Sequence, residues 1–349
     1  MHTPPKQMTG VQLIGHGDLS QLQVNHSIDI PTPGLGDALI KVHAAGVNNT
    51  DLNLRTGWYS KSDQSSDDAG WQGNAIPFPL IQGADVCGTV VAVGPEADPQ
   101  LVGCRVLVEP CFHERHGKQL DRPVYLGSDC HGGFAEYTTV PARYAHRINS
   151  TLTSTELASF PCSYSTAENL LTRAKVTAQD IVLITGASGG VGSAAIQLAN
   201  ARGARVIAVT SPSKADALLK LGAHRTVDRD SHLPDTVGTD SVDVVIDLVG
   251  GSHWPLLLNA LKPFGRYATS GAIAGPIVEL DLRTLYLKDL SLFGGTALSP
   301  EIFPALIQRI ESGNISPLVA QTFPLAQIPE AQRAFECKQH IGKLVIEIA

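Results

Sequence analysis

The sequence predicts an α/β protein of two domains, a β-rich barrel-type domain and a domain built on a doubly wound parallel sheet. Its 349 residues exceed what one ordinary hydrophobic core accommodates. Short strands at close spacing fill the first 150 residues, which is typical of a compact barrel. From about residue 155, strands and helices alternate, and this order builds a doubly wound sheet.

The first domain contains candidate strands at residues 38–43, 88–93 and 105–108, with glycine or proline turns close to their ends. Two polar segments interrupt this pattern. Residues 60–75 are rich in Ser, Asp and Gly, and residues 111–129 are rich in charge and histidine. We expect both segments to be solvated surface loops.

The second domain begins with a continuous apolar run at residues 181–185, as expected of a strand that is buried on both faces. A glycine-rich turn and a helix at residues 191–202 follow it. The alternation continues with strands and helices at residues 205–210, 214–221, 242–248, 265–269 and 291–293. An amphipathic helix at residues 302–310 and a last strand at residues 343–348 complete the chain.

The composition excludes several classes of protein. Hydrophobic residues make up 43% and charged residues 17%, which is a globular composition. A net charge of −7 without any basic run offers no surface for nucleic acid or an anionic membrane. No run approaches the roughly 18 apolar residues that a membrane-spanning helix needs. Because the six cysteines form no CxxC pair and the N-terminus lacks a signal peptide's apolar core, we expect a cytoplasmic protein.

The glycine-rich turn predicts a dinucleotide-binding site. Residues 185–192 read Thr-Gly-Ala-Ser-Gly-Gly-Val-Gly and lie between a strand and a helix. Gly189 and Gly190 let the backbone approach a pyrophosphate, and Gly192 lets the helix pack closely on the sheet. The helix N-terminus then offers N–H groups to the phosphates. The expected contacts are Ala187, Ser188, Gly189, Gly190 and Val191.

The end of the next strand favours NADPH over NADH. An NAD site places an acid there for the ribose 2′-hydroxyl, but this chain has Thr210 and Ser211, with Lys214 following and no acid before Asp216. Hydroxyls and a cation suit a 2′-phosphate, and Arg229 could add a planar guanidinium. The alternative is that both cations are ordinary exposed surface charges.

Several motifs resemble the medium-chain dehydrogenase/reductase superfamily, and above all its zinc-free, quinone-oxidoreductase-like branch. They cover nearly the whole chain apart from the two polar segments, and they occur in the family's order. The motifs are Ala-Ala-Gly-Val-Asn-Asn-Thr-Asp at 44–51, Arg-Thr-Gly-Trp-Tyr at 55–59, and the stretches 83–94, 132–137, 186–192 and 342–343.

The resemblance implies a GroES-like catalytic domain and a Rossmann cofactor domain. It also implies that the last strand returns to the first domain. We therefore expect a catalytic domain at residues 1–154 that is completed by 297–349, and a Rossmann domain at residues 155–296. A homodimer is implied too, with a possible interface at the strand around residues 291–295.

The departures from the zinc-dependent members are informative. Those members hold a catalytic metal at places that correspond here to Asn48, Ala84 and Cys162, of which only Cys162 is a possible ligand. A catalytic zinc needs three protein ligands. The segment 111–131 carries cysteines and histidines, but their spacing matches no standard zinc pattern. We therefore expect no metal, and we interpret Cys162 as a packing residue.

Without a metal, the oxygen that becomes negative during hydride transfer needs hydrogen-bond donors. The resemblance makes Tyr59 the first candidate, and Asn48 the second because it takes the place of a metal ligand. The alternatives are a packing tyrosine and a turn asparagine.

Further cofactor contacts are expected at the ends of successive sheet strands, where the crevice of a doubly wound fold lies. Together with positions suggested by the resemblance, these contacts are Thr166, Leu248, Val249, Gly250, Ser270, Gly271, Phe293, Gly294 and Lys343.

The sequence thus predicts an NADPH-dependent oxidoreductase that transfers a hydride to a quinone, an enone or a related activated carbonyl compound without catalytic zinc. Two alternatives remain. One is a carbonyl reductase of the alcohol or aldehyde dehydrogenase type. The other is a non-enzymatic NADPH-binding sensor or structural protein.

Overall fold

The computed structural model describes residues 5–61 and 68–348. The chain forms two compact units, Met1–Cys162 with Pro317–Ala349, and Ser163–Ser316. The sequence suggested boundaries at residues 154 and 297. In the structure the first boundary falls later, in the first turn of helix α3 (Pro161–Arg173). The second boundary also falls later, because helix α9 (Ile302–Glu311) belongs to the second unit.

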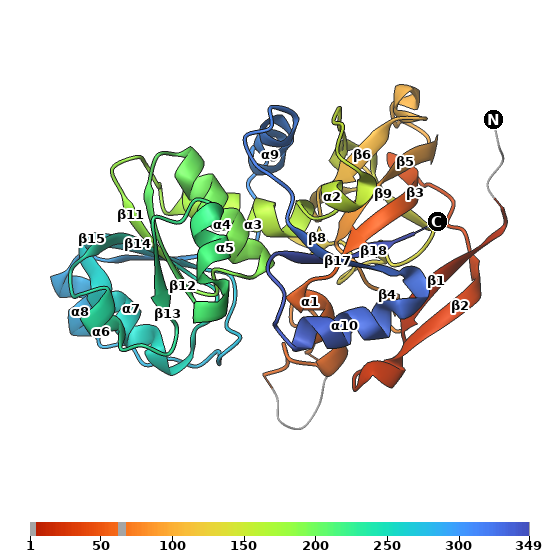
Figure 1. Cartoon of the computed structure of the whole chain (residues 1–349). Helices are drawn as coiled ribbons and strands as arrows, with labels where there is room; N and C mark the ends of the chain where they lie inside the picture. The colour runs from red at the N-terminus through yellow and green to blue at the C-terminus, as the bar shows by residue number, and fades with distance from the viewer. Residues whose placement is uncertain (1–4, 62–67, 349) are drawn as a thin grey trace. The chain divides into compact units, whose positions relative to one another are not determined.

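The first unit is built mainly on antiparallel strands (Figure 1). A three-stranded sheet has the order β2-β1-β4, with bounds Leu22–Asp29, Gln7–Leu13 and Leu80–Ile81. A seven-stranded sheet has the order β10-β6-β5-β3-β18-β17, and β9 also pairs with β3. Its strands are Ala145–Arg147, Arg105–Val108, Asp85–Val93, Asp37–Gly46, Lys343–Glu347, Val319–Pro324 and Tyr137–Pro141.

Strand β18 shows why the last segment belongs to this unit. It pairs antiparallel with β3 and parallel with β17, so the C-terminal strand lies inside the sheet rather than at its edge. Leu344, Val345 and Ile346 are buried on its two faces. The expected return of the last strand to the first domain is therefore confirmed.

One of the two polar segments is not a simple surface loop. Residues 111–125 form a hairpin of β7 (Cys111–Arg115) and β8 (Lys118–Tyr125). Its tip at residues 116–119 is exposed, but Phe112 and Tyr125 are buried. The expectation of a solvated loop is wrong for the base of the hairpin, because apolar side chains at the two ends of the polar segment pair and face the core.

The other polar segment is described only in part, since residues 62–67 lie outside the described residues. In the part that follows them, Ala69 is buried and Trp71 is half-buried. The ring of Trp71 stacks on that of Tyr125 with 4.9 Å between the centroids. The described end of this segment therefore packs on the first unit.

The second unit is a six-stranded, all-parallel sheet of order β13-β12-β11-β14-β15-β16, as the sequence predicts. In Figure 1, α4 (Gly190–Ala201) and α5 (Ala215–Lys220) lie on one side of it, and α7 (Trp254–Ala260) and α8 (Leu282–Leu287) on the other. The strands are Arg225–Asp228, Arg205–Thr210, Ile181–Ile184, Val242–Asp247, Leu261–Thr269 and Ser291–Gly294. Within residues 5–61 and 68–348, no helix is long and apolar enough to cross a membrane.

Helix α1 (Asn49–Thr56) begins at a buried carboxylate. Asp51 Oδ2 accepts a hydrogen bond from Asn48 N at 2.8 Å, and Oδ1 accepts one from Gly83 N at 3.3 Å. This side chain therefore ties the start of α1 to the turn before β5. Burial, the largest influence, raises the pKa of Asp51 to about 7.

The raised pKa of Asp51 predicts a pH-dependent stability. The folded chain keeps the Asp51 proton up to a pH of about 7, whereas the unfolded chain releases it near 3.8. The stability that protonated Asp51 contributes is therefore complete at low pH and is lost as the pH rises through 7. We expect the unfolding free energy of the native protein, relative to Asp51→Asn, to fall as the pH rises from about 4 to about 7 and to level off above that. Urea titrations of both proteins check this, and parallel pH curves would contradict it.

Candidate functional site

The glycine-rich turn of the second unit joins β11 to α4. Gly186 has φ +57°, and a side chain at Gly192 would place its Cβ 2.3 Å from the Gly186 carbonyl oxygen. Glycine is therefore required at position 192, since the helix passes directly over the turn. The first turn of α4 then presents its free N–H groups at the end of the strand.

A buried carboxylate that sequence reasoning missed holds this turn to its neighbour. Asp247 ends β14 and is fully buried. Its Oδ1 accepts a hydrogen bond from Thr185 Oγ1 at 2.5 Å, and its Oδ2 accepts one from the Tyr267 hydroxyl at 2.6 Å. The N–H groups of Val249 and Gly250 donate to the same carboxylate. The turns after β11 and β14 are thereby fixed against each other.

The parallel sheet brings most of the predicted cofactor contacts to one edge. Residue pairs such as Thr210 with Asp228 and Thr269 with Gly294 are in register, so the carboxyl ends of the strands meet there. Leu248 and Gly250 are buried, whereas Ser270 and Gly294 are exposed. The residues at or just after these strand ends are Ala187, Ser188, Gly189, Gly190, Val191, Thr210, Ser211, Leu248, Val249, Gly250, Ser270, Gly271, Phe293 and Gly294.

Two cationic residues follow neighbouring strands, Lys214 after β12 and Arg229 after β13. Lys214 Nζ donates to Ser188 Oγ at 3.5 Å, and Arg229 N donates to the carbonyl oxygen of Thr210 at 2.9 Å. Burial lowers the pKa of Lys214, and the charge of Arg229 lowers it further. Among the described residues, the buried Thr210 Oγ1 has no hydrogen-bond partner. Two neighbouring cations and an unsatisfied hydroxyl are the groups that a phosphate monoester satisfies.

Two of the predicted cofactor contacts, Thr166 and Lys343, do not lie at these strand ends. Thr166 is half-buried on α3 in the second unit. Lys343 begins β18 in the first unit, and its side chain is 3% exposed. Its ammonium binds Asp85 Oδ2 at 2.7 Å, Asn48 Oδ1 at 2.6 Å and the Val47 carbonyl oxygen at 2.9 Å.

Asn48 is fully engaged in this buried cluster. Its amide nitrogen donates to Asp85 Oδ2 at 2.9 Å, while its oxygen accepts from Lys343. The backbone N–H of Cys162 donates to Asp85 Oδ1. Sequence reasoning missed Asp85, although it directly follows Ala84, one of the places compared with a metal ligand.

Tyr59 lies in an aromatic row of the first unit. Its ring meets those of Trp58 and Trp71 edge to face, with 5.4 and 5.6 Å between the centroids. Its hydroxyl interacts with the side chains of Thr50 and Asn53. Burial, the largest influence, raises the pKa of Tyr59, so its hydroxyl keeps its proton.

The half-buried Cys162 and the buried Tyr125 form a further pair, with a hydrogen bond between their side chains. Burial is the largest influence on both groups. It raises the pKa of the Cys162 thiol to about 12 and holds the pKa of Tyr125 well above its usual range. Cys162 is therefore a protonated thiol at neutral pH.

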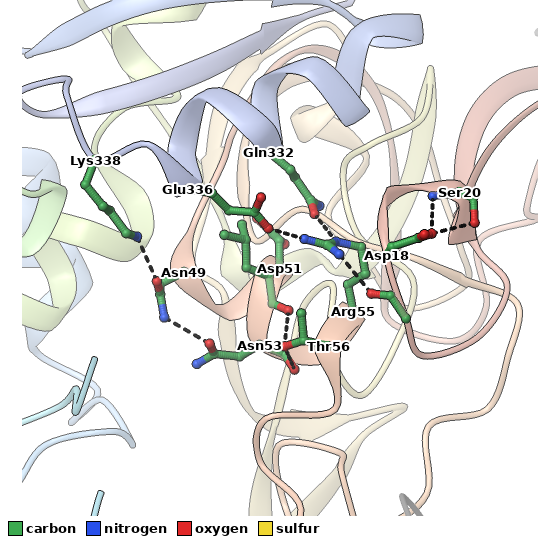
Figure 2. A network of polar contacts seen from close by, with 12 residues as sticks. Asp18, Ser20, Asn49, Asp51, Asn53, Arg55, Thr56, Gln332, Glu336 and Lys338 are labelled. Carbon is green, nitrogen blue, oxygen red and sulfur yellow. Dashed lines mark hydrogen bonds and ion pairs between the residues drawn. The ribbon is translucent and has the colours of Figure 1, made fainter. Parts of the chain in front are cut away.

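Arg55, another residue without a role in the sequence prediction, anchors α1 (Figure 2). It donates to Gln332 Oε1 at 2.8 Å and to Glu336 Oε1 at 2.5 Å, both on α10 (Ile328–Glu336). Gln332 continues the chain of contacts to Gln82 Oε1 at 3.1 Å, and the Gln82 amide donates to the Asp51 carbonyl oxygen at 2.7 Å. The helix between Asn48 and Tyr59 is thus held from both ends.

The metal-ligand places of zinc-dependent relatives do not fit a zinc ion here. The Asn48 oxygen is already bound to an ammonium, and Ala84 has no donor atom. After the hairpin, His131 Nδ1 accepts a hydrogen bond from Ile81 N at 3.2 Å. Within the described residues, no group of three or more His, Cys, Asp or Glu could hold a metal ion.

The chain is similar to several dehydrogenases and reductases. The alcohol dehydrogenase GroES-like domain family matches residues 34–150, and the zinc-binding dehydrogenase family matches residues 190–312. Quinone oxidoreductase from Homo sapiens is 28% identical, covering 95% of this chain and 94% of that protein. An NAD-dependent alcohol dehydrogenase from Sulfolobus acidocaldarius is 30% identical, covering 92% and 95%.

Solved structures agree with these relatives. A putative alcohol dehydrogenase from Sinorhizobium meliloti superposes with a TM-score of 0.92 and 45% identity, covering 100% of this chain and 99% of that one. The quinone oxidoreductase from Coxiella burnetii gives 0.80 and 25%, covering 99% and 100%. Fold, motifs and relatives agree, and the chain belongs to the medium-chain dehydrogenase/reductase superfamily of oxidoreductases that use a nicotinamide cofactor.

Proposed function

We propose that this protein is a cytoplasmic, NADPH-dependent oxidoreductase that reduces a quinone, an enone or a related activated carbonyl compound without catalytic zinc. The observation that carries this proposal is the cluster of Asn48, Asp85 and Lys343. An ammonium is bound there by residues that include one of the metal-ligand places of zinc-dependent relatives. Quinone oxidoreductases among the relatives support the choice of acceptor.

The preference for NADPH is supported by the end of β12. Lys214 follows this strand end with no acid between Thr210 and Asp216, and the exposed Arg229, which is paired with Asp230 at 3.7 Å, lies close enough for its charge to lower the pKa of Lys214. A 2′-phosphate with nearly two negative charges would interact with both cations and would satisfy the Thr210 hydroxyl. The 2′-hydroxyl of NADH offers none of this electrostatic attraction.

Replacing Lys214 tests the cofactor preference. Lys214→Ala is expected to weaken NADPH binding by about tenfold to a hundredfold, because a charged hydrogen bond contributes about 1.5–3 kcal/mol. NADH binding should change little. Lys220→Ala, which removes the same charge from an exposed position on α5, is the matched control. Fluorescence titration with both cofactors measures this, and equal affinity of the native protein for NADPH and NADH would refute the preference.

Tyr59 is the hydrogen-bond donor that we propose for the acceptor oxygen. The bound cofactor supplies the hydride, and the protein stabilises the negative charge that develops on that oxygen. The raised pKa of Tyr59 keeps its hydroxyl protonated, and binding a substrate would exchange its contacts with Thr50 and Asn53 for the acceptor oxygen. Asn48 is the weaker candidate, since its amide would have to leave Asp85 and Lys343 to reach a substrate.

Tyr59→Phe keeps the ring contacts and removes only the hydroxyl. Loss of one preorganised donor is expected to lower kcat by about 10²–10³ while NADPH affinity stays unchanged. Tyr137→Phe, on β9 of the same unit, is the control and should leave kcat as it is. An unaltered kcat in Tyr59→Phe would make Tyr59 a packing residue.

The acceptor itself is identified by a panel of quinones, enones, enoyl thioesters and aldehydes in an NADPH oxidation assay. Alcohol dehydrogenases among the relatives favour an aldehyde as the second candidate. Turnover of aldehydes in preference to quinones and enones would establish that alternative. Tight NADPH binding without turnover of any acceptor would indicate a sensor or structural protein.

The second unit also supports a homodimer. Strand β16 is the edge of the parallel sheet, and its Leu292 is exposed together with Leu282, Tyr286 and Leu287 of α8. An unpaired edge strand beside exposed apolar side chains favours pairing with a second copy of the same edge. Sedimentation velocity that finds only monomers would contradict this.

A further inference from the structure

The ammonium of Lys343 lies in a closed shell of oxygen atoms. Its three N–H groups match three acceptors, Asp85 Oδ2, Asn48 Oδ1 and the Val47 carbonyl oxygen, at 2.6–2.9 Å. The side chain of Asp85 is 0% exposed and that of Lys343 is 3% exposed. Three converging oxygens around a buried positive charge form a cation site, which a side chain of the protein itself occupies.

Further ionisable side chains lie around this ion pair. Asp51 is buried beside it and interacts electrostatically with both Lys343 and Asp85. The thiol of Cys162 interacts electrostatically with Asp51, Asp85 and Lys343. Its backbone N–H donates a hydrogen bond to Asp85 Oδ1. Two carboxyl groups and a thiol therefore surround one cation. Removing that cation would leave the Asp85 carboxylate buried and uncompensated, which is strongly unfavourable.

We propose that Lys343 is a tethered cation that takes the place of the divalent metal held by zinc-dependent members of the superfamily. The site is therefore closed to metal in the native protein. Removing the ammonium converts it into a divalent-cation site with Asp85, Asn48 and the Val47 carbonyl as ligands. This inference deepens the zinc independence of the proposed function and does not depend on which acceptor is reduced.

The chemistry of the vacated site indicates which metals it takes. Three oxygen ligands, one of them charged, suit a hard or borderline divalent cation. The Cys162 thiol is a candidate fourth ligand, since metal binding displaces the thiol proton. Co²⁺ is a suitable probe because its visible spectrum reports on the ligands around it.

The test compares variants that differ in charge and in space. Lys343→Ala removes the ammonium and opens the volume that the side chain filled. Lys343→Met removes the charge but fills much of that volume with an apolar chain. Lys343→Ala/Asp85→Asn also removes the charged ligand. Each full-length protein is treated with a chelator, dialysed and titrated with Co²⁺, followed by visible absorption, calorimetry and Tm.

We expect Lys343→Ala to bind about one Co²⁺ per chain and to gain thermal stability from it. The native protein, Lys343→Met and the double variant should show neither effect. Because no turnover is measured, a failure here is distinguishable from a failure of the proposed reaction, which the acceptor panel reports.

Two results would overturn the inference. One is Co²⁺ uptake by the native protein that is lost on replacing Asp85, since the site would then be open to metal. The other is a Lys343→Ala protein that binds no more Co²⁺ than the native chain. If Lys343→Ala does not fold in chelator, refolding in Co²⁺ is expected to recover it. Failure to recover while Lys343→Met folds would count against the proposal.

Discussion

The first unit depends on one buried carboxylate, that of Asp85. A carboxylate that is removed from water must be paired and hydrogen-bonded, and this requirement determines what surrounds it. Lys343 supplies the charge, the Asn48 amide and the Cys162 N–H supply further hydrogen bonds, and glycine at position 46 leaves the space. A Cβ on Gly46 would lie 2.6 Å from Asp85 Oδ2. The C-terminal strand thus has an electrostatic role as well as a place in the sheet.

The second unit also contains a buried carboxylate that organises the residues around it, but at a different kind of site. Asp247 is also fully buried, but its partners are neutral groups: the hydroxyls of Thr185 and Tyr267 and two backbone N–H groups. These bonds fix the two turns that the sequence marks as a cofactor cradle. One buried carboxylate therefore orients a candidate dinucleotide-binding edge, and the other organises a site beside candidate catalytic residues. In both units a polar group in the interior determines local geometry at the functional residues.

The features of the fold that the sequence predicts are those that depend on local patterns of residues. Residues close together in the chain determine the glycine turn, the strand that ends at Thr210 and the alternating strands and helices of the parallel sheet. The spacing of residue types along the sequence therefore predicts these features. The Asp85–Lys343 pair joins residues 258 positions apart, and Arg55 binds residues 277 and 281 positions away. Contacts between residues so far apart leave no periodic pattern in the sequence. The sequence does not predict the hairpin at residues 111–125, because its buried side chains lie at the ends of a charged segment.

The central claim is that a lysine ammonium, and not a metal ion, is the cation at Asp85. Anomalous diffraction at the zinc absorption edge, from crystals of the native protein grown with excess Zn²⁺, tests this most directly. The account predicts continuous density for the Lys343 side chain up to Asp85 and Asn48, with no anomalous peak between them. An anomalous peak at Asp85 and Cys162, with the Lys343 side chain displaced, would contradict it.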